Sequence, residues 1–319
     1  METLIIDAYC HILPSPIAKT ARHPKLRSFA GIPQFVDPDQ RLKHMEKYGV
    51  DVQVLSLVPT VLSGVEISEA IPLCQTANDA IAQIARTSRG RFEGIASVPL
   101  PSIGEALDEL DRAVNELNLH GVQIFSNIHG RPLDSEEFFP FYERVLEHDV
   151  PILIHPVDRN GYELIKQHRL NIMLGWPFDT SLAMVSLVQG GVFDRYPSLK
   201  ILTHHLGAMI PYFMGRVNCE SEPAFVHYDA EAGVERPLVQ YFKKFYADTA
   251  VDGWHHALNL GYSFFGPDQV LFSTDYPFGP EGGELFPREL IRGISELNIS
   301  EQERQKIFED NARKLFKLT

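Results

Sequence analysis

Short apolar segments recur along the whole chain, and each is followed by a stretch with helical periodicity. The segments are rich in Val, Ile, Leu and Phe and do not alternate with polar residues, which is typical of strands buried on both faces of a parallel sheet. We predict strands at Thr3–Asp7, Val52–Leu57, Phe92–Val98, Gly121–Phe125, Pro151–His155, Lys200–His204, Phe245–Asp248 and Val270–Thr274. We predict helices at Asp37–Tyr48, Ser68–Thr87, Ile103–Asn118, Ser135–His148, Thr180–Gln189 and Arg288–Glu296.

About eight strands alternating with helices over 319 residues predict an α/β fold, a (β/α)8 barrel. A doubly wound open sheet is the alternative, but the sequence contains neither of the glycine-rich phosphate loops, GxGxxG and GxxxxGK[ST], that often accompany it. The sequence shows no internal repeat, low-complexity segment or linker. We therefore expect residues 1–319 to form a single domain, with a loop insertion around residues 20–36 after the first strand.

The charge and the cysteines narrow the class of partner. Asp and Glu number 42 against 29 Lys and Arg, so the formal net charge is −13, which argues against nucleic acid or an anionic membrane as a partner. Three cysteines without a CxxC pair fit a reducing cytoplasm. The first residues lack the basic start of a signal peptide, and no segment approaches the roughly 18 apolar residues of a membrane span. We expect a cytoplasmic protein whose partner is a small molecule.

Ionisable side chains stand where four of the predicted strands end. The first strand runs into His11, the fifth ends at His155, the sixth leads into His204 and His205, and the last is followed by Asp275. In a barrel these strand ends open into the active-site mouth. Two histidines and an aspartate from different strands can hold one metal ion with an open coordination position. A further histidine there can take or give protons near neutral pH.

An ordered set of motifs extends this interpretation. They are Asp37-Pro38 with Arg41, the segment Gly49–Pro59, Gly121–Ile124, His155-Pro156, Gly190–Phe193, His205-Leu206-Gly207-Ala208 with Pro211, Gly215-Arg216, and Thr274–Phe278. In this order they resemble the 2-amino-3-carboxymuconate-6-semialdehyde decarboxylase-like family, the metal-dependent decarboxylase branch of the amidohydrolase superfamily. The resemblance implies a distorted (β/α)8 barrel of the amidohydrolase type, with one divalent metal ion. That ion is usually zinc, and the ligand types also accept manganese.

The resemblance also implies roles for individual residues. His11, His155 and Asp275 match metal ligands of the family, and His205 matches its catalytic histidine because Leu206-Gly207-Ala208 and Pro211 fix the register. His204 is then expected to face the barrel wall. Either Asp275 or His205 is expected to deliver the proton that replaces the departing carboxylate.

Substrate-binding residues are expected around this centre. Arg216 matches an arginine that, in the family's dimers, reaches the neighbouring subunit's site and grips a substrate carboxylate, so a homodimer is expected. Aromatic residues after the strands are expected to form an apolar wall at the mouth: Trp176, Phe178, Tyr276 and Phe278.

The sequence departs from the family pattern at Tyr9. Tyr9 replaces the first histidine of the HxH metal-binding pair, and we also count it among the substrate-binding residues. A phenol with a pKa near 10 is a poor ligand unless the metal lowers that pKa. Three interpretations stay open: Tyr9 coordinates as a phenolate, the metal is held by the other three ligands alone, or the metal is lost. The end of the fourth strand, at Gln123, has no lysine, so the carbamylated lysine of binuclear relatives is absent.

The resulting hypothesis is a metal-dependent, non-oxidative decarboxylase acting on a small unsaturated or aromatic carboxylate with a hydroxyl or oxo group. Two alternatives stay open. One is a metal-dependent hydrolase of the same superfamily, acting on a lactone or a C–C bond. The other is a metal-free member that only binds or regulates.

Overall fold

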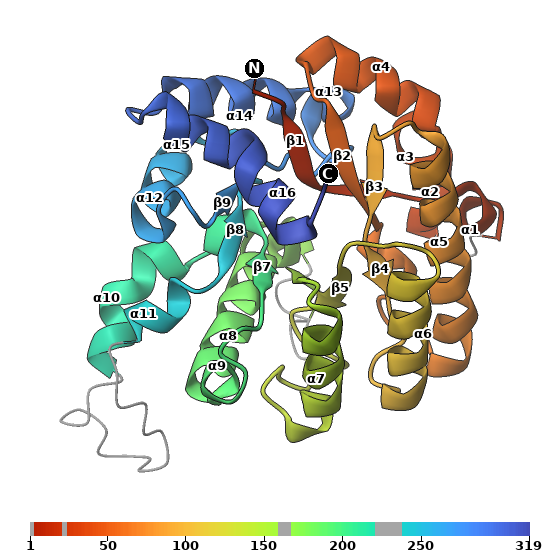
Figure 1. Cartoon of the computed structure of the whole chain (residues 1–319), viewed down its shortest axis with the longest axis horizontal. Helices are drawn as coiled ribbons and strands as arrows, with labels where there is room; N and C mark the ends of the chain where they lie inside the picture. Colours follow the sequence, from red (N-terminus) through yellow and green to blue (C-terminus); the bar gives the residue numbers. More distant parts are fainter. Residues whose placement is uncertain (1–2, 21–23, 159–166, 221–237) are drawn as a thin grey trace.

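The computed structural model describes residues 3–20, 24–158, 167–220 and 238–319, and its strands form a parallel barrel (Figure 1). The strands follow one another around the barrel in chain order, in two hydrogen-bonded groups, β1-β2-β3 and β4 to β9. They are β1 (Ile6–Ile12), β2 (Val52–Leu57), β3 (Phe92–Gly94), β4 (Ala96–Ser97), β5 (Val122–Phe125), β6 (Ile152–His155), β7 (Ile201–Thr203), β8 (Tyr246–Asp248) and β9 (Val270–Leu271).

Backbone hydrogen bonds join the two groups into a ring. The Ala8 amide donates to the Phe272 carbonyl (2.9 Å), which links β1 to the residue after β9. The Ile95 amide, between β3 and β4, donates to the Leu55 carbonyl of β2 (3.0 Å). The third predicted strand is therefore present as two short pieces, β3 and β4. The predicted (β/α)8 barrel is confirmed.

Helices surround the barrel, and several follow the predicted ranges. Those that follow strands β1 to β5 are α1 (Ser15–Thr20), α2 (Pro24–Ala30), α3 (Pro33–Val36), α4 (Pro38–Tyr48), α5 (Ile67–Thr87), α6 (Ile103–Asn115) and α7 (Phe139–His148). Those that follow β6 to β8 are α8 (Trp176–Gln189), α9 (Val192–Arg195), α10 (Ile210–Glu220), α11 (Val239–Phe242) and α12 (His255–Phe265). The last are α13 (Pro280–Gly283), α14 (Leu285–Glu296), α15 (Glu301–Gln305) and α16 (Asn311–Phe316).

The predicted start of α4 illustrates why these residues form a helix here. The Asp37 carboxylate accepts a hydrogen bond from the Asp39 amide (2.9 Å), and Pro38 occupies the first turn, where its missing N–H has no cost. Gly49 ends the helix in the left-handed conformation (φ 67°). The segment predicted as an insertion carries α2 and α3, while residues 21–23 lie outside the described part of the chain.

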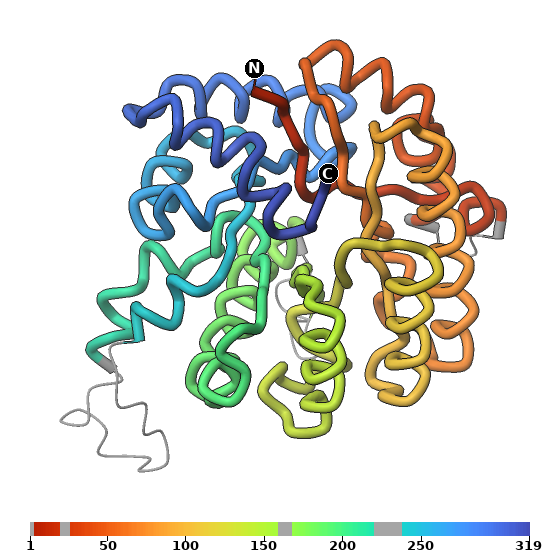
Figure 2. Tube along the Cα trace, viewed as in Figure 1, coloured from red at the N-terminus to blue at the C-terminus, as the bar shows by residue number. Residues whose placement is uncertain are grey.

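The strands have an apolar core on each side, one outside the barrel and one inside it. The larger core fills the space between strands and helices. The smaller one lies inside the barrel and combines Ile6, Leu153 and Leu202 with Leu315 and Phe316 of α16. The C-terminal helix thus closes the amino-terminal end of the barrel, beside the first strand (Figure 2). The carboxyl ends of the strands, at the opposite end, carry the polar residues of the candidate site. Within the described ranges, no helix has the length and apolarity needed to cross a bilayer.

Candidate functional site

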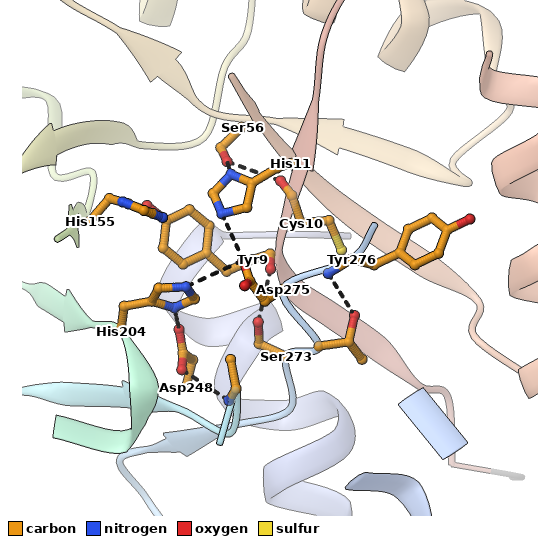
Figure 3. Close-up of polar contacts among 12 residues, drawn as sticks. Tyr9, Cys10, His11, Ser56, His155, His204, Asp248, Ser273, Asp275 and Tyr276 are labelled. Atoms are coloured by element: carbon orange, nitrogen blue, oxygen red, sulfur yellow. Dashed lines mark hydrogen bonds and ion pairs between the residues drawn. The ribbon is translucent and has the colours of Figure 1, made fainter. Parts of the chain in front are cut away.

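Four ionisable side chains meet at the carboxyl ends of the strands (Figure 3). One atom each of His11, His155, His204 and Asp275 lies within 4.8 Å of the others. His11 lies in β1 and His155 ends β6, whereas His204 and Asp275 follow β7 and β9. The structure therefore brings together the three residues matched to metal ligands and adds His204.

Each of the three histidines is held through its Nδ1 atom. The partners are Ser56 Oγ for His11 (2.7 Å), the Pro156 carbonyl for His155 (2.7 Å) and the Asp248 carboxylate for His204. A partner on Nδ1 fixes the ring orientation and leaves Nε2 to face the centre of the cluster. Metal-bound histidines are held in this manner.

Atoms in the centre of the cluster lack hydrogen-bond partners among the described residues. His11 Nε2, His204 Nε2 and Asp275 Oδ1 are buried and make no hydrogen bond of acceptable geometry. The Asp275 oxygen lies 3.0 Å from the His11 nitrogen and 3.4 Å from the His204 nitrogen. Buried polar atoms without partners are costly, and a shared cation would satisfy all three at once. Imidazole nitrogens with one carboxylate suit zinc or manganese.

The protonation states follow from burial and neighbouring charge. Burial lowers the pKa of His11 and, together with the other histidines, holds the pKa of His155 well below its usual range. Burial alone would also lower the pKa of His204, but the Asp248 and Asp275 carboxylates outweigh it and raise that pKa to about 10. Burial opposes ionisation of Asp275, yet the adjacent His11 and His204 lower the pKa of this carboxyl.

The expectation that His204 faces the barrel wall is wrong. Side chains alternate along a strand. Leu202 lies in the inner core, and Thr203 faces outward, where its hydroxyl contacts Met184 Sδ of α8 (3.4 Å). His204 keeps an extended backbone (φ −81°, ψ 158°) and so points inward again.

His205 lies beside the cluster because the chain turns sharply after His204. Residues 205–208 all have positive φ, between 53° and 75°, which breaks the alternation of the strand. Leu206 anchors the turn against α12 at Gly261, where any Cβ would lie 2.2 Å from the Leu206 side chain. The centres of the His205 and His204 rings are 3.9 Å apart. The buried Nδ1 atom of His205 has no hydrogen-bond partner in the described structure. Burial and the charge on His204 lower the pKa of His205 to about 4.

Three of the residues predicted to bind substrate border the cluster. The ring centres of Phe278 and His11 are 5.6 Å apart, and those of Trp176 and His155 are 5.9 Å apart. The Tyr9 ring lies 4.8 Å from the His204 ring.

Tyr9 does not offer its oxygen to the cluster as a free ligand. Its hydroxyl donates to Gln123 Oε1 (2.8 Å), while the Gln123 amide nitrogen donates to the Leu57 carbonyl (3.1 Å). Burial, with Asp248 and Asp275 nearby, raises the pKa of Tyr9 well above its usual value. Of the three interpretations of Tyr9, the phenolate ligand is therefore the least consistent with the structure.

Two other predicted residues lie away from the cluster. Tyr276 was expected in the apolar wall, but it points away from the histidines (Figure 3) and stacks on His44, with ring centres 3.7 Å apart. That expectation is wrong, and the left-handed backbone of Asp275 (φ 60°) interrupts the strand geometry just before Tyr276. Arg216 is exposed on α10, and no contact within the described ranges joins it to the cluster. Its role toward substrate stays a prediction.

A cavity of about 420 Å³ is lined by residues that adjoin the cluster in the chain or support it, while the four cluster residues themselves are not part of the lining. Gln123, which holds Tyr9, lines it, as do Val157 and Asp158, which follow His155 closely in the chain. Apolar side chains such as Leu62, Val98 and Phe125 form much of the rest of the lining. A volume and lining of this kind are typical of a site for a small organic molecule.

Comparison with known proteins agrees with this geometry. The pattern of the amidohydrolase family matches residues 6–318. The chain belongs to the amidohydrolase family. Within it, the chain is 35% identical over 270 residues to a 2-amino-3-carboxymuconate-6-semialdehyde decarboxylase of Dictyostelium discoideum, covering 84% of this chain and 73% of the relative. It is 31% identical over 294 residues to a gamma-resorcylate decarboxylase of Polaromonas sp. strain JS666, covering 88% and 87%.

A solved structure extends the comparison. A dihydroxybenzoic acid decarboxylase from Polaromonas sp. JS666, with bound manganese and the inhibitor 2-nitroresorcinol, superimposes with a TM-score of 0.83 at 26% identity, covering 99% of this chain and 97% of that one. The predicted resemblance to the decarboxylase branch is confirmed.

Sequence reasoning missed two residues that position the histidines. Asp248 ends β8 and Ser56 lies in β2, and both are buried polar residues in largely apolar strands. Polar side chains are uncommon in buried strands, so these two residues could have been recognised from the sequence as candidates for the site. Asp248 in particular stands at a strand end, the same position that singled out His155.

Proposed function

We propose that this amidohydrolase is a metal-dependent carboxy-lyase that removes CO2, without oxidation, from a small aromatic or unsaturated carboxylate bearing a hydroxyl or oxo group. The observation that carries the proposal is the convergence of His11, His155 and Asp275 on one point, where His11 Nε2 and Asp275 Oδ1 are buried without a hydrogen-bond partner in the described structure. Relatives that share this family and most of this length are named as decarboxylases of such acids.

His11, His155 and Asp275 would hold one divalent cation. When bound there, the cation supplies Lewis-acid chemistry toward an oxygen of the substrate. Manganese is present in a structural neighbour, and zinc accepts the same ligand types. Ser56 and the Pro156 carbonyl keep the His11 and His155 rings in the orientation that this role requires.

The reaction itself needs one proton and the loss of one C–C bond. A proton is added to the carbon that bears the carboxylate, which interrupts the conjugation of the substrate. The bond to the carboxylate then breaks, its electron pair restores the conjugated system, and CO2 leaves. His205 or Asp275 delivers the proton, since both follow strand ends at the cluster. The pKa values of both groups are lowered, that of His205 to about 4, so either residue must first take up the proton that it then delivers.

The cavity supports a small substrate with an apolar body. Its lining contains neither Lys nor Arg among the residues that the structure describes. The substrate carboxylate therefore needs a cation from elsewhere. Arg216, exposed on α10, is proposed to supply it from its own or from a neighbouring subunit, and the second case requires a homodimer.

The test combines metal analysis with product analysis. Protein purified and loaded with manganese or zinc is incubated with 2,6-dihydroxybenzoate and with 2-amino-3-carboxymuconate-6-semialdehyde, and the CO2 released is measured. We expect one metal ion per chain and CO2 in equal amount to the decarboxylated product. The variant His205→Ala should keep the metal and lose about 10²- to 10⁴-fold in kcat. The control variant His120→Gln changes a histidine that pairs with Glu93 before β5, and it should keep both the metal and the wild-type kcat.

Two outcomes would refute the proposal. Ring opening or water addition without CO2 would favour the hydrolase alternative, in which a metal-bound water is the nucleophile. A protein that contains no metal after loading, and that binds carboxylates without converting them, would favour the metal-free alternative.

A further inference from the structure

We infer that His204 is a ligand of the metal ion and that it takes, from the end of β7, the coordination position that the family pattern fills from residue 9. This inference rests on the metal site of the proposed function. It goes further because it assigns the site a fourth ligand and explains how a tyrosine is tolerated in the HxH pair.

The first argument is the direction of the His204 ring. Its Nδ1 is bonded to the Asp248 carboxylate, and its Nε2 points into the cluster. The ring is fully buried, and Nε2 makes no hydrogen bond of acceptable geometry in the described structure. A carboxylate on one ring nitrogen and a free second nitrogen is the arrangement of a metal-bound histidine with its supporting carboxylate.

The second argument is that Tyr9 leaves a position open. Its hydroxyl is committed to Gln123 Oε1, which the Leu57 carbonyl holds in place through the other end of the amide. The Tyr9 ring lies beside the His11 ring (5.1 Å), the His155 ring (6.3 Å) and the His204 ring (4.8 Å). Residue 9 thus borders the site from which a shorter histidine would reach the same centre. His204 reaches that centre instead.

The third argument is charge. Asp248 and Asp275 are both carboxylates at the site, and each is close to His204. A divalent cation bound by three neutral imidazoles balances the two negative charges, which is the favourable state for a buried cluster. The His204 Nε2 atom lies 3.4 Å from Asp275 Oδ1, so a cation bound by that oxygen is within reach of His204 as well.

The experiment compares metal affinity across variants of neighbouring histidines. Dissociation constants for Zn²⁺ and Mn²⁺ are measured by competition with a chromophoric chelator, and metal content is measured after dialysis. His204→Ala should weaken binding by at least about 100-fold, and Asp248→Asn by about 10- to 100-fold. His205→Ala, the matched control at the adjacent position, should bind as tightly as the wild type. Tyr9→Phe should also bind normally, because the hydroxyl is not a ligand.

The decisive variant is the exchange Tyr9→His with His204→Ala. It should recover most of the affinity that His204→Ala loses, since a nitrogen donor returns to the same centre from β1. The Co²⁺-loaded proteins give a second readout, because the visible absorption of Co²⁺ should change in His204→Ala and return in the exchange variant. Circular dichroism of each metal-free variant checks folding, and His204→Gln replaces His204→Ala if the latter does not fold.

The inference is overturned if folded His204→Ala or His204→Gln binds metal as tightly as His205→Ala. It is also overturned if the exchange variant recovers no affinity. Both results leave the proposed function intact if CO2 is still released. Conversely, if every variant shows the metal affinity expected above but no substrate yields CO2, the proposed function alone is refuted.

Discussion

Asp7 is a buried carboxylate whose ionisation should cost the fold stability. It is 1% exposed, and its two oxygens accept hydrogen bonds from the amide (2.9 Å) and the hydroxyl (2.5 Å) of Thr274. Burial outweighs these bonds and raises its pKa from 3.8 to about 6. Because the folded state disfavours the ionised form, the cost is absent below pH 3.8, grows as the pH rises, and is complete above about pH 6. Its full size is about 3 kcal/mol.

The variant Asp7→Asn removes this titration. It also leaves the Thr274 hydroxyl without its acceptor, a loss of about 1–3 kcal/mol that does not depend on pH. At pH 5 the ionisation cost in the wild type is about 1.5 kcal/mol, half of its value at pH 7.5. The free energy of unfolding of Asp7→Asn should therefore rise by about 1.5 kcal/mol relative to the wild type between these two pH values.

Urea unfolding of the metal-stripped proteins at pH 5 and pH 7.5 measures this difference. The control Asp51→Asn removes the same charge from a half-buried position, where the carboxylate accepts a hydrogen bond from the Ile5 amide (2.8 Å). It reports the part of the effect that comes only from the net charge of −13. Parallel pH profiles for the wild type and Asp7→Asn would refute the reasoning, as would a relative loss of stability at the higher pH.

Four further predictions concern metal binding, packing and a second titration. Chelation of the metal should lower the melting temperature, since a cation at 100 times its Kd stabilises the fold by about 2.7 kcal/mol, and calorimetry with and without chelator checks this. Gly94→Ala places a Cβ 2.4 Å from Ile81 Cγ2 and should cost about 1–3 kcal/mol in urea unfolding. Asn78→Leu removes the amide that donates to buried Glu109 (2.6 Å) and should cost about 3 kcal/mol by the same measurement, with Asn78→Asp as the near-isosteric comparison. Burial lowers the pKa of His44 from 6.5 to about 4, so the wild type should lose about 2 kcal/mol between pH 7 and pH 5 that His44→Phe retains; equal losses in both proteins would contradict this.

The alternation of strands and helices could be predicted from the sequence, because strands buried in a parallel sheet are continuous runs of apolar residues. The exception is the first strand, which was predicted at Thr3–Asp7 but extends over Ile6–Ile12. Its polar residues suggested the loop after a strand. They lie within the strand because the inside of the barrel at this end is the site itself, and all seven residues of β1 are buried.

Part of the site could also be predicted, because the predicted strand ends show which side chains lie at the mouth of the barrel. His11, His155 and Asp275 could be placed at strand ends from the sequence alone, and the structure brings them within a few ångströms of one another. The motif does not predict the direction of the His204 side chain. The register of Leu206-Gly207-Ala208 identifies His205 and gives no information about the residue before it. Only the outward contact of Thr203 with α8 fixes which way His204 points.

The closure of the barrel by α16 has a consequence for how the protein matures in the cell. His11 lies in the first strand of the barrel, but Asp275 follows the last strand, and the helix that seals the barrel comes after it. The cation can therefore meet its full set of ligands only after the chain from β1 to Asp275 has been made. Metal loading should follow translation, and the supply of free metal at that moment then decides which ion the finished molecule carries.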